Sequence, residues 1–223
     1  MSALPENWST APIGLLCDLI NGRAFKPTDW TDVGLPIVRI QNLNNPNAAY
    51  NHFDGEVRER FLIDHGDLLF AWSGTPGTSF GAHVWQGGKA VLNQHIFKVI
   101  FDEDHLDRDF FRYAINQKLQ ELIDKAHGGV GLRHVTKGKF EETEIELPPR
   151  DEQTRIVAKL DGLFARTHRV RDELNRIPLL IQHYKQAVLS AAFGSSIEVE
   201  AQGPDSPSTV LLTELIDDGP SNG

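Results

Sequence analysis

An apolar repeat between Pro148 and Phe193 constrains the fold more than any other stretch of the sequence. Counted from Ile156 in alternating steps of four and three residues, its positions are apolar except at Thr167. A period of about 3.5 residues held over about five heptads is typical of a coiled coil, in which a helix buries this seam against another helix. We therefore predict a long, coiled-coil-forming helix over residues 150–193, with the seam residues Ile156, Leu160, Leu163, Val170, Leu174, Ile177, Ile181, Tyr184 and Val188.

The ends of this helix carry residues with known capping preferences. Asp151 follows two prolines and is a suitable N-cap, and Gly194 is a suitable end. Such a helix is roughly 60 Å long, and Pro178 should kink it, because proline lacks an amide hydrogen and crowds the preceding turn. The alternative is two shorter core helices separated at Pro178. Because the long helix suits a spacer or a docking element, we expect the functional site to lie before it.

The first 149 residues indicate a compact mixed domain, so the predicted fold class is α+β: a β-rich domain followed by a long helix. Short runs of β-branched and aromatic residues between turn-forming clusters predict strands at 37–40, 67–72, 82–85, 95–101 and 144–147. Residues 107–125 have the apolar spacing of one helix. Residues 194–210 are rich in Ser, Pro, Gly and acidic residues, which is typical of a linker.

Composition excludes several classes of protein. The sequence has no apolar run long enough for a membrane span, no signal pattern and a single cysteine, Cys17, which together favour the cytoplasm. The net charge of −9 disfavours nucleic acid, but residues 194–223 contribute six acidic side chains and no basic one. The stretch from Lys125 to Phe140 is basic and lacks acidic residues, and a local basic patch is what phosphate binding requires.

The sequence lacks a recognisable catalytic centre. The nine histidines form no HExxH motif and no pairing with cysteines, so no metal site is predicted. Gly87-Gly88-Lys89 resembles the end of a phosphate-binding loop, but Ala90 stands where Ser or Thr should hold magnesium. A Gly-x-Ser-x-Gly elbow, a Gly-rich cofactor loop and an Asn/Asp-Pro-Pro-aromatic motif are all missing. We therefore predict a protein that is not an enzyme and that carries no metal or cofactor of its own.

Polar side chains in loops beside the predicted strands are candidates for DNA contacts. Arg, Asn and Gln can read base edges in the major groove, and glycine-rich segments let backbone amides approach phosphates. The candidates are Arg23, Lys26, Arg39, Gln41, Asn42, Asn44, Ser73, Thr75, Thr78, Ser79, Asn93, Gln94, His95, Arg133, His134, Lys137 and Lys139. The cations after position 130 suit phosphates, and Gln41, Asn42 and Ser73 suit base edges. The alternative for each residue is an ordinary solvated turn.

Several motifs together resemble the specificity subunit of type I restriction–modification systems. They are Leu4-Pro5-Glu6-Asn7-Trp8, residues 66–74, Asn93-Gln94-His95 and, most specific, Leu147-Pro148-Pro149 followed by Glu152-Gln153 and Ile156. The resemblance covers residues 4–193. It implies a target-recognition domain over 1–149 that reads one half of a split double-stranded DNA target, followed by a spacer helix. It also implies methyltransferase subunits, which use S-adenosylmethionine to methylate adenine, and a motor–nuclease subunit that cuts.

The chain departs from the family pattern, in which the unit occurs twice in tandem. Residues 212–217 repeat the pattern of residues 16–21, so we interpret 211–223 as the start of a second recognition domain; chance is the alternative. A fragment, a natural truncation and a split gene would each explain this. The unpaired seam predicts a homodimer through the long helix, which would read a symmetric bipartite site. Alternatively, a second specificity half or the methyltransferase subunit covers the seam.

Two functions of other classes are also compatible with parts of the sequence. The acidic net charge would suit a coiled-coil adaptor whose β-rich domain binds protein rather than DNA. A small hydrolase using one of the histidines is disfavoured, because the sequence offers no nucleophile with a partnered base.

Overall fold

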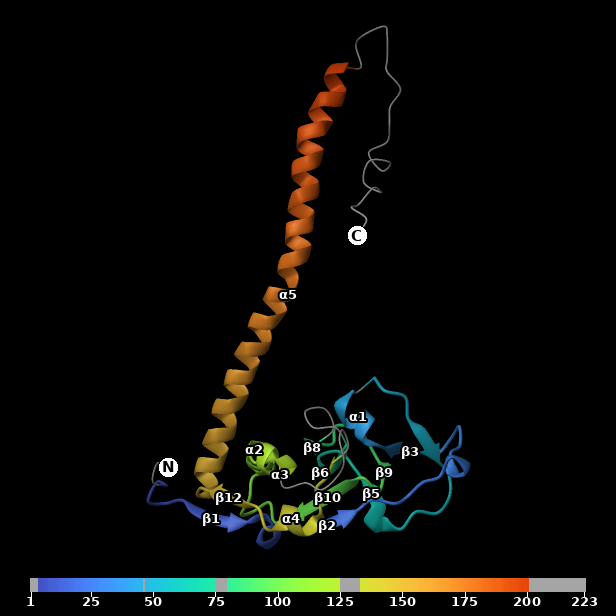
Figure 1. Ribbon diagram of the computed structural model, residues 1–223, viewed down its shortest axis with the longest axis vertical. Helices are drawn as coiled ribbons and strands as arrows, with labels where there is room; N and C mark the ends of the chain where they lie inside the picture. Colours follow the sequence, from blue (N-terminus) through green and yellow to red (C-terminus); the bar gives the residue numbers. More distant parts are fainter. Residues whose placement is uncertain (1–3, 46, 75–79, 125–132, 201–223) are drawn as a thin grey trace. The chain divides into compact units, whose positions relative to one another are not determined.

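The computed structural model describes residues 4–45, 47–74, 80–124 and 133–200, with side chains as far as Phe193 and without that of Arg133. The chain divides into two units, residues 1–162 and 163–223, and each is described by itself. The strands and short helices lie in the first unit, and the second contains helix α5 (Arg150–Glu200) from Leu163 onward (Figure 1). This arrangement of elements along the chain confirms the predicted α+β class.

A four-stranded antiparallel sheet carries the larger hydrophobic core. Its strand order is β2 (Cys17–Asn21), β10 (Ile96–Phe101), β6 (Leu68–Ala71) and β8 (Gly81–Val84). All four residues of β6 are buried, because alternate side chains of a strand point to opposite faces and both faces are covered here. Leu68 and Phe70 enter the larger cluster and Leu69 the smaller one. Burial on both faces explains why this strand is apolar without alternation.

A second four-stranded sheet has the order β4 (Asn51–Phe53), β3 (Leu35–Val38), β9 (Ala90–Leu92) and β5 (Leu62–Ile63). The β3–β9 pair is parallel and the other two pairs are antiparallel. Two short antiparallel pairs complete the strands: β1 (Ser9–Pro12) with β12 (Glu144–Leu147), and β7 (Ser73–Gly74) with β11 (Arg133–His134). The β1–β12 pair brings the beginning of the chain beside the strand that precedes α5.

Short helices complete the first unit. The α-helices are α1 (Ile40–Asn44), α2 (Arg108–Gln117), α3 (Leu119–Asp124) and α4 (Lys137–Glu141), and the 3-10 helices are η1 (Ile13–Leu15), η2 (Pro27–Asp29) and η3 (Glu59–Phe61). Asp107 caps α2 by accepting hydrogen bonds from the amides of Asp109 and Phe110. The prediction of one helix over 107–125 is wrong, because α2 ends with Lys118 as its C-cap and α3 begins anew at Leu119.

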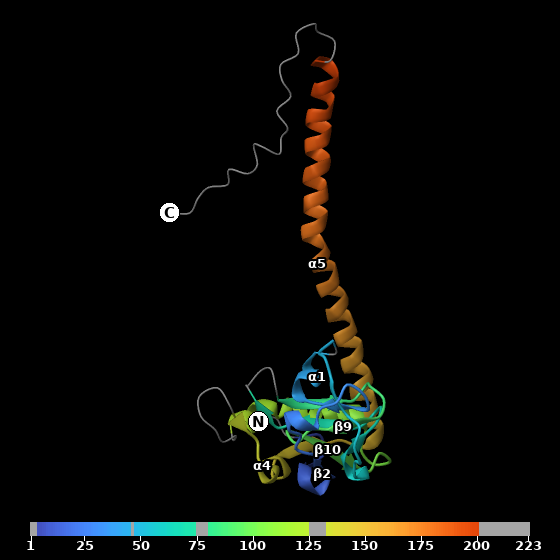
Figure 2. The same cartoon turned by 90° about the vertical axis from the view of Figure 1, so that its right-hand side faces the viewer.

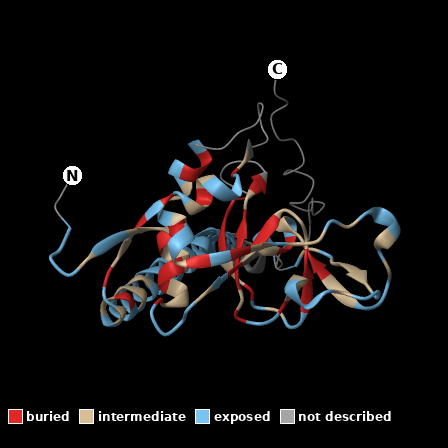
Figure 3. Cartoon of the chain, turned by 90° about the horizontal axis from the view of Figure 1, so that it is seen from below, coloured by how far each residue is buried: buried red, intermediate tan, exposed pale blue. Residues whose placement is uncertain are grey.

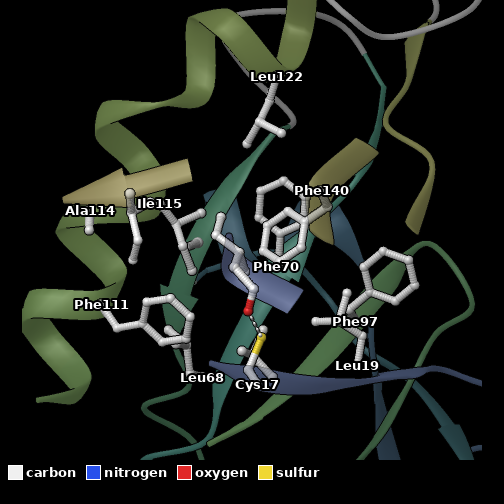
Figure 4. Packing of buried hydrophobic residues seen from close by; sticks show 14 of the residues in the cluster. Cys17, Leu19, Leu68, Phe70, Phe97, Phe111, Ala114, Ile115, Leu122 and Phe140 are labelled. Atoms are coloured by element: carbon white, nitrogen blue, oxygen red, sulfur yellow. Dashed lines mark hydrogen bonds between the residues drawn. The ribbon is translucent and has the colours of Figure 1, made fainter. Parts of the chain in front are cut away.

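The larger cluster packs α2, α3 and α4 against the β2–β10–β6–β8 sheet, as the close-up in Figure 4 shows. The rings of Phe70 and Phe140 lie 4.4 Å apart, which joins the sheet to α4. Cys17 is buried here, and its thiol donates to the carbonyl of Ile13. Burial raises the pKa of this thiol to about 12, so Cys17 is an unreactive core residue. Buried residues concentrate in these strands and in the inward faces of the helices (Figure 3).

The first turns of α5 are bonded into the first unit through Gln153, which is 1% exposed. Its Oε1 accepts from the amide of Asp107, and its Nε2 donates to the carbonyls of His105 and Pro148. Arg150 pairs with the Asp107 carboxylate at 2.9 Å. Further out, the Tyr113 hydroxyl donates to Asp161. These bonds explain the glutamine at position 153: its amide satisfies three backbone groups at the beginning of α5.

Helix α5 continues without interruption through Pro178 and on to Glu200 (Figure 2). This excludes two helices separated at Pro178. Gly194, expected to end the helix, lies inside it, because one glycine costs a helix only about 1 kcal/mol. The helical backbone therefore includes the first residues of the predicted linker, while 201–210 and the predicted second-domain start at 211–223 lie outside the described residues.

The seam side chains of the second unit are exposed, with Tyr184 at 71% and Val170 at 60%. Of the predicted seam, Ile156 instead packs against the larger core of the first unit. The exposed members are Leu163, Val170, Leu174, Ile177, Ile181, Tyr184 and Val188. Exposed apolar side chains at heptad spacing form the kind of surface that a coiled-coil helix buries against a partner.

Candidate nucleic-acid interface

The loops that follow β2, β3 and β9 meet around a cavity of about 270 Å³, which we call the amide pocket. It is lined by Phe25, Trp30, Ile37, Arg39, Ile40, Gln41, Asn93, Gln94 and His95. The structure therefore brings together candidate residues that are more than fifty positions apart in the sequence. These side chains offer amides and one guanidinium beside aromatic rings, which is chemistry suited to nucleobases.

Gly22 allows two of these loops to meet. The Arg23 amide donates to the carbonyl of Leu92 at 2.8 Å, and Arg23 and Asn93 form a parallel β-bridge. A Cβ atom at Gly22 would overlap the carbonyl of Asn93. The Asn93 amide donates in turn to Val38 at the end of β3. Glycine at this position thus permits the backbone contact that forms one side of the amide pocket.

Arg39 and Asn42 shape the α1 side of the pocket. The strand predicted over 37–40 ends at Val38, because the side chain of Asn42 accepts from the Arg39 amide and starts α1. Asn42 is 3% exposed, and its amide also donates to the carbonyls of Ala48 and Ala49. Its predicted role at a base edge is therefore corrected to a structural one. Gln41 is exposed, and its side chain forms no hydrogen bond within the described part of the chain.

Two arginines beside the pocket stack on aromatic rings. The guanidinium of Arg23 lies 4.4 Å from the ring centroid of Phe53 and 5.0 Å from that of Phe25. The guanidinium of Arg39 lies 5.7 Å from the Trp30 ring, and it donates to Asn51. Stacking leaves part of each guanidinium edge for other acceptors and holds it in place. The exposed Lys26 lies in the same loop as Arg23.

His95 connects the pocket to a second group of candidates. Its Nε2 lies 3.2 Å from Nε2 of Gln94, and its ring lies 5.3 Å from that of Trp72. Burial, followed by the nearby His134 and Arg39, lowers the pKa of His95, so the ring is neutral at pH 7. The Trp72 ring also lies 5.8 Å from His134, whose Nδ1 is 2.9 Å from Oγ of Ser73.

Ser73, assigned from sequence to a base edge, is 5% exposed and occupied by the bond to His134. Because it is buried and bonded to His134, its predicted role at a base edge is corrected to a structural one. Thr75, Thr78 and Ser79 lie outside the described residues. Asn44 is exposed at the last turn of α1, and it is not among the lining residues of the pocket.

The structure pairs the cations that were assigned to phosphates. Lys137 lies 3.5 Å from Glu141, and Lys139 lies 3.0 Å from Glu142, both across turns of α4. These glutamates reduce the local positive charge that the assignment relied on. The side chain of Arg133 is outside the described residues. Arg23 and Lys26, which form no ion pair in the described ranges, are better placed to meet phosphates.

Sequence reasoning missed the aromatic part of this surface. Phe53, Trp30 and Trp72 hold Arg23, Arg39 and His95 through ring contacts. The signal in the sequence was a tryptophan, Trp30, four residues after the candidate Lys26; the structure leaves it 40% exposed. Exposed aromatics beside arginines are a common feature of nucleic-acid surfaces.

Comparison with known proteins identifies the class of this domain. Residues 5–178 match the type I restriction modification DNA specificity domain. The chain belongs to this family. The matched domain is a DNA-recognition domain and not a catalytic one, so the expectation of a non-enzymatic recognition unit is confirmed. The proteins compared below give no support to the adaptor interpretation.

Named relatives of this specificity domain span more than one genus. The chain is 28% identical over 192 residues to the type I restriction enzyme EcoBI specificity subunit of Escherichia coli, covering 85% of this chain and 39% of the relative. It is 25% identical to the StySPI specificity subunit of Salmonella potsdam, covering 87% and 44%. The chain thus spans less than half the length of these relatives.

Solved structures share the fold. The HsdS subunit from Thermoanaerobacter tengcongensis aligns with a TM-score of 0.57 and 21% identity, covering 74% of this chain and 39% of that one. A subunit from a structure of type I restriction–modification complex assembly aligns with a TM-score of 0.66, covering 86% and 47%. Among the described helices, none combines the length and apolarity that crossing a bilayer requires.

Proposed function

We propose that this chain is the DNA sequence-recognition component of a type I restriction–modification complex in the cytoplasm. It directs adenine methylation, and cleavage where a motor–nuclease subunit is present, to one half of a bipartite double-stranded DNA target. The observation that carries the proposal is the extent of the family match, which includes the recognition domain and most of the spacer helix. The chemistry itself belongs to methyltransferase subunits, which use S-adenosylmethionine as the methyl donor.

The DNA-facing surface in this proposal is the amide pocket with its flanking arginines and the Trp72–His134 group. Gln41 and Gln94 are its candidates for base edges, and Arg23, Lys26 and Arg39 are its candidates for phosphates or base edges. Paired cations elsewhere in the domain give it little charge of its own, which supports weak DNA binding by the isolated chain. The methyltransferase partner would then add affinity by closing around the DNA.

The exposed seam of α5 supports a second part of the proposal, which is homodimerisation. A seam of identical residues on two copies makes a self-complementary contact, so two chains can pack their helices together. Such a dimer would place two identical recognition domains on a symmetric split target. A second, different specificity half would give an asymmetric target instead.

Mapping adenine methylation tests the proposal. The chain is expressed together with a type I methyltransferase subunit in a host without other adenine methylation, and methylated positions are read across the genome. A split motif supports DNA recognition, and its symmetry supports the homodimer. An asymmetric split motif supports the recognition role and contradicts the homodimer. A methyltransferase that binds the chain but methylates no defined motif would contradict the recognition role.

A further inference from the structure

The amide pocket is a hollow, and this shape limits how it can meet DNA. Base edges lie at the floor of the major groove and are reached by elements that project into it, such as a helix or a β-ribbon. Arg39, Asn93 and His95 instead line a cavity between loops. A cavity accommodates a group that projects from the DNA, which is either a phosphate or a base that has left the stack.

The lining of the pocket favours a base over a phosphate. Arg39 is its only cation among the described residues, and that guanidinium already donates to Asn51 and stacks on Trp30. His95 adds no charge at pH 7, because burial lowers its pKa. Four of the nine lining residues are aromatic or aliphatic: Phe25, Trp30, Ile37 and Ile40. Flat apolar walls suit the faces of a base and give little to a phosphate.

The polar groups of the pocket suit the edge of a base. Amides carry a donor and an acceptor in a fork, which is the pattern that base edges offer in return. The side-chain amide of Gln41 forms no hydrogen bond within the described ranges, and that of Gln94 bonds only to the ring of His95 there. The volume of about 270 Å³ is just below the range of about 300–1,000 Å³ that holds drug-sized ligands, so it fits a group the size of one base.

We propose that the amide pocket binds one unpaired nucleobase of the DNA, stacked against Trp30 and bonded along its edge by Gln41 and Gln94. This inference rests on the proposed function and deepens it, because it adds an extrahelical base to recognition of the duplex. Removing a base from the stack costs free energy, and the cost is lowest for a base that has no partner. The pocket therefore prefers DNA that already contains an unpaired nucleotide.

Equilibrium binding of the full chain to matched duplexes tests this preference. One set of probes is a perfect 30-base-pair duplex, and the other is the same duplex with a single extra A, C, G or T at its centre. We expect at least one bulged duplex to bind roughly tenfold more tightly than the perfect one, as stacking of one base on an aromatic ring provides. Equal binding of all the duplexes overturns the inference. The proposed function is not affected by that result, because the methylation map tests it separately.

Variants of the lining residues show whether a preference for the bulged duplex arises at the amide pocket. Trp30→Ala and Gln94→Leu should abolish the preference for the bulge, measured as the ratio of the affinities for the bulged and the perfect duplex, while Trp30→Phe should retain it. Phe61→Ala is the matched control, because Phe61 also carries a stacked arginine but lies outside the pocket. A preference that survives Trp30→Ala overturns the inference. So does tight binding of free deoxynucleoside monophosphates at the pocket, which would assign it to a nucleotide rather than to DNA.

Discussion

Oε1 of Gln153 accepts a 2.7 Å hydrogen bond from the backbone amide of Asp107, the residue that caps α2. One buried amide thus ties the root of α5 to the start of another helix. Replacing Gln153 with Met keeps the volume and removes all three of its bonds to backbone groups. We expect a loss of about 2–4 kcal/mol in the free energy of unfolding, because buried backbone groups lose their partners.

Urea unfolding followed by circular dichroism measures this change. Arg155→Ala is the control, because Arg155 lies in the same turns of α5 with its side chain 76% exposed, and it should change stability by less than about 0.5 kcal/mol. A Gln153→Met protein as stable as the parent would show that the root of α5 contributes little to the first unit.

Gly22→Ala should damage the amide pocket. The new methyl group would overlap the carbonyl of Asn93, so the loops after β2 and β9 must separate, at a cost of about 1–3 kcal/mol. Gly162→Ala is the matched control, because nothing lies within 4 Å of a Cβ there and α5 should gain about 0.5–1 kcal/mol. Thermal unfolding of both variants measures the two changes in stability, which should have opposite signs. If both variants are more stable than the parent, the close approach of Gly22 to Asn93 is contradicted.

The phosphate contacts can be located by salt dependence. Arg23→Ala with Lys26→Ala should lower the slope of log affinity against log salt by about 0.9 for each lost contact. Lys137→Ala with Lys139→Ala should change the slope less, because Glu141 and Glu142 already balance these charges. Binding of the complex with methyltransferase to duplex DNA at several salt concentrations measures both. If the Lys137 and Lys139 substitutions change the slope more, these two lysines contact phosphates, as the sequence analysis predicted.

The seam should control association. Leu174→Asp with Ile181→Asp places charges at two exposed seam positions, and we expect a homodimer to become a monomer. Gln182→Asp, an exposed polar position between seam residues, should leave the dimer intact. Sedimentation equilibrium gives the mass of each protein. A parent chain that is already monomeric would instead favour a different chain as the seam's partner.

Two histidines should make the first unit less stable in acid. Burial, with Arg112 nearby, lowers the pKa of His83, and burial also lowers that of His95. The unfolded chain therefore takes up these protons at higher pH than the folded chain. Their contribution to stability is complete above the ordinary histidine pKa of about 6.5 and is lost as the pH falls below it. His83→Gln should flatten the decline in the free energy of unfolding between pH 7 and 5, whereas the exposed His168→Gln should not.

The fold was predictable where a local pattern coincided with burial. Residues 144–147 form β12 as expected, because glutamates alternate there with Ile145 and Leu147 before two prolines, and 95–101 contain β10, a run rich in β-branched and aromatic residues. The break at Lys118 was not predictable, because the apolar spacing continues across it and α2 and α3 share one core. Helix α1 is too short for a helical period to show, so its residues were assigned to a strand and a loop.

Several residues of the site were predictable from the sequence, whereas the residues that they contact were not. Arg39, Gln41 and the Asn93-Gln94-His95 run were selected from sequence, and they line one cavity. The burial of Asn42 and Ser73 depends on contacts from distant segments, which one sequence does not display. Lys137 was chosen from a window without acids, and its partner Glu141 lies just beyond that window, where only helical spacing brings the two charges together.

The exposed seam also has a thermodynamic consequence. The first unit has its own buried clusters, so its unfolding needs no second chain, whereas the part of α5 beyond Leu163 has little but water around its apolar side chains. An isolated helix gains most of its stability from packing. Heating should therefore produce two transitions: one at a fixed temperature, and one that moves to higher temperature as the chain is concentrated. Dilution alone would then melt the spacer while the recognition domain stays folded.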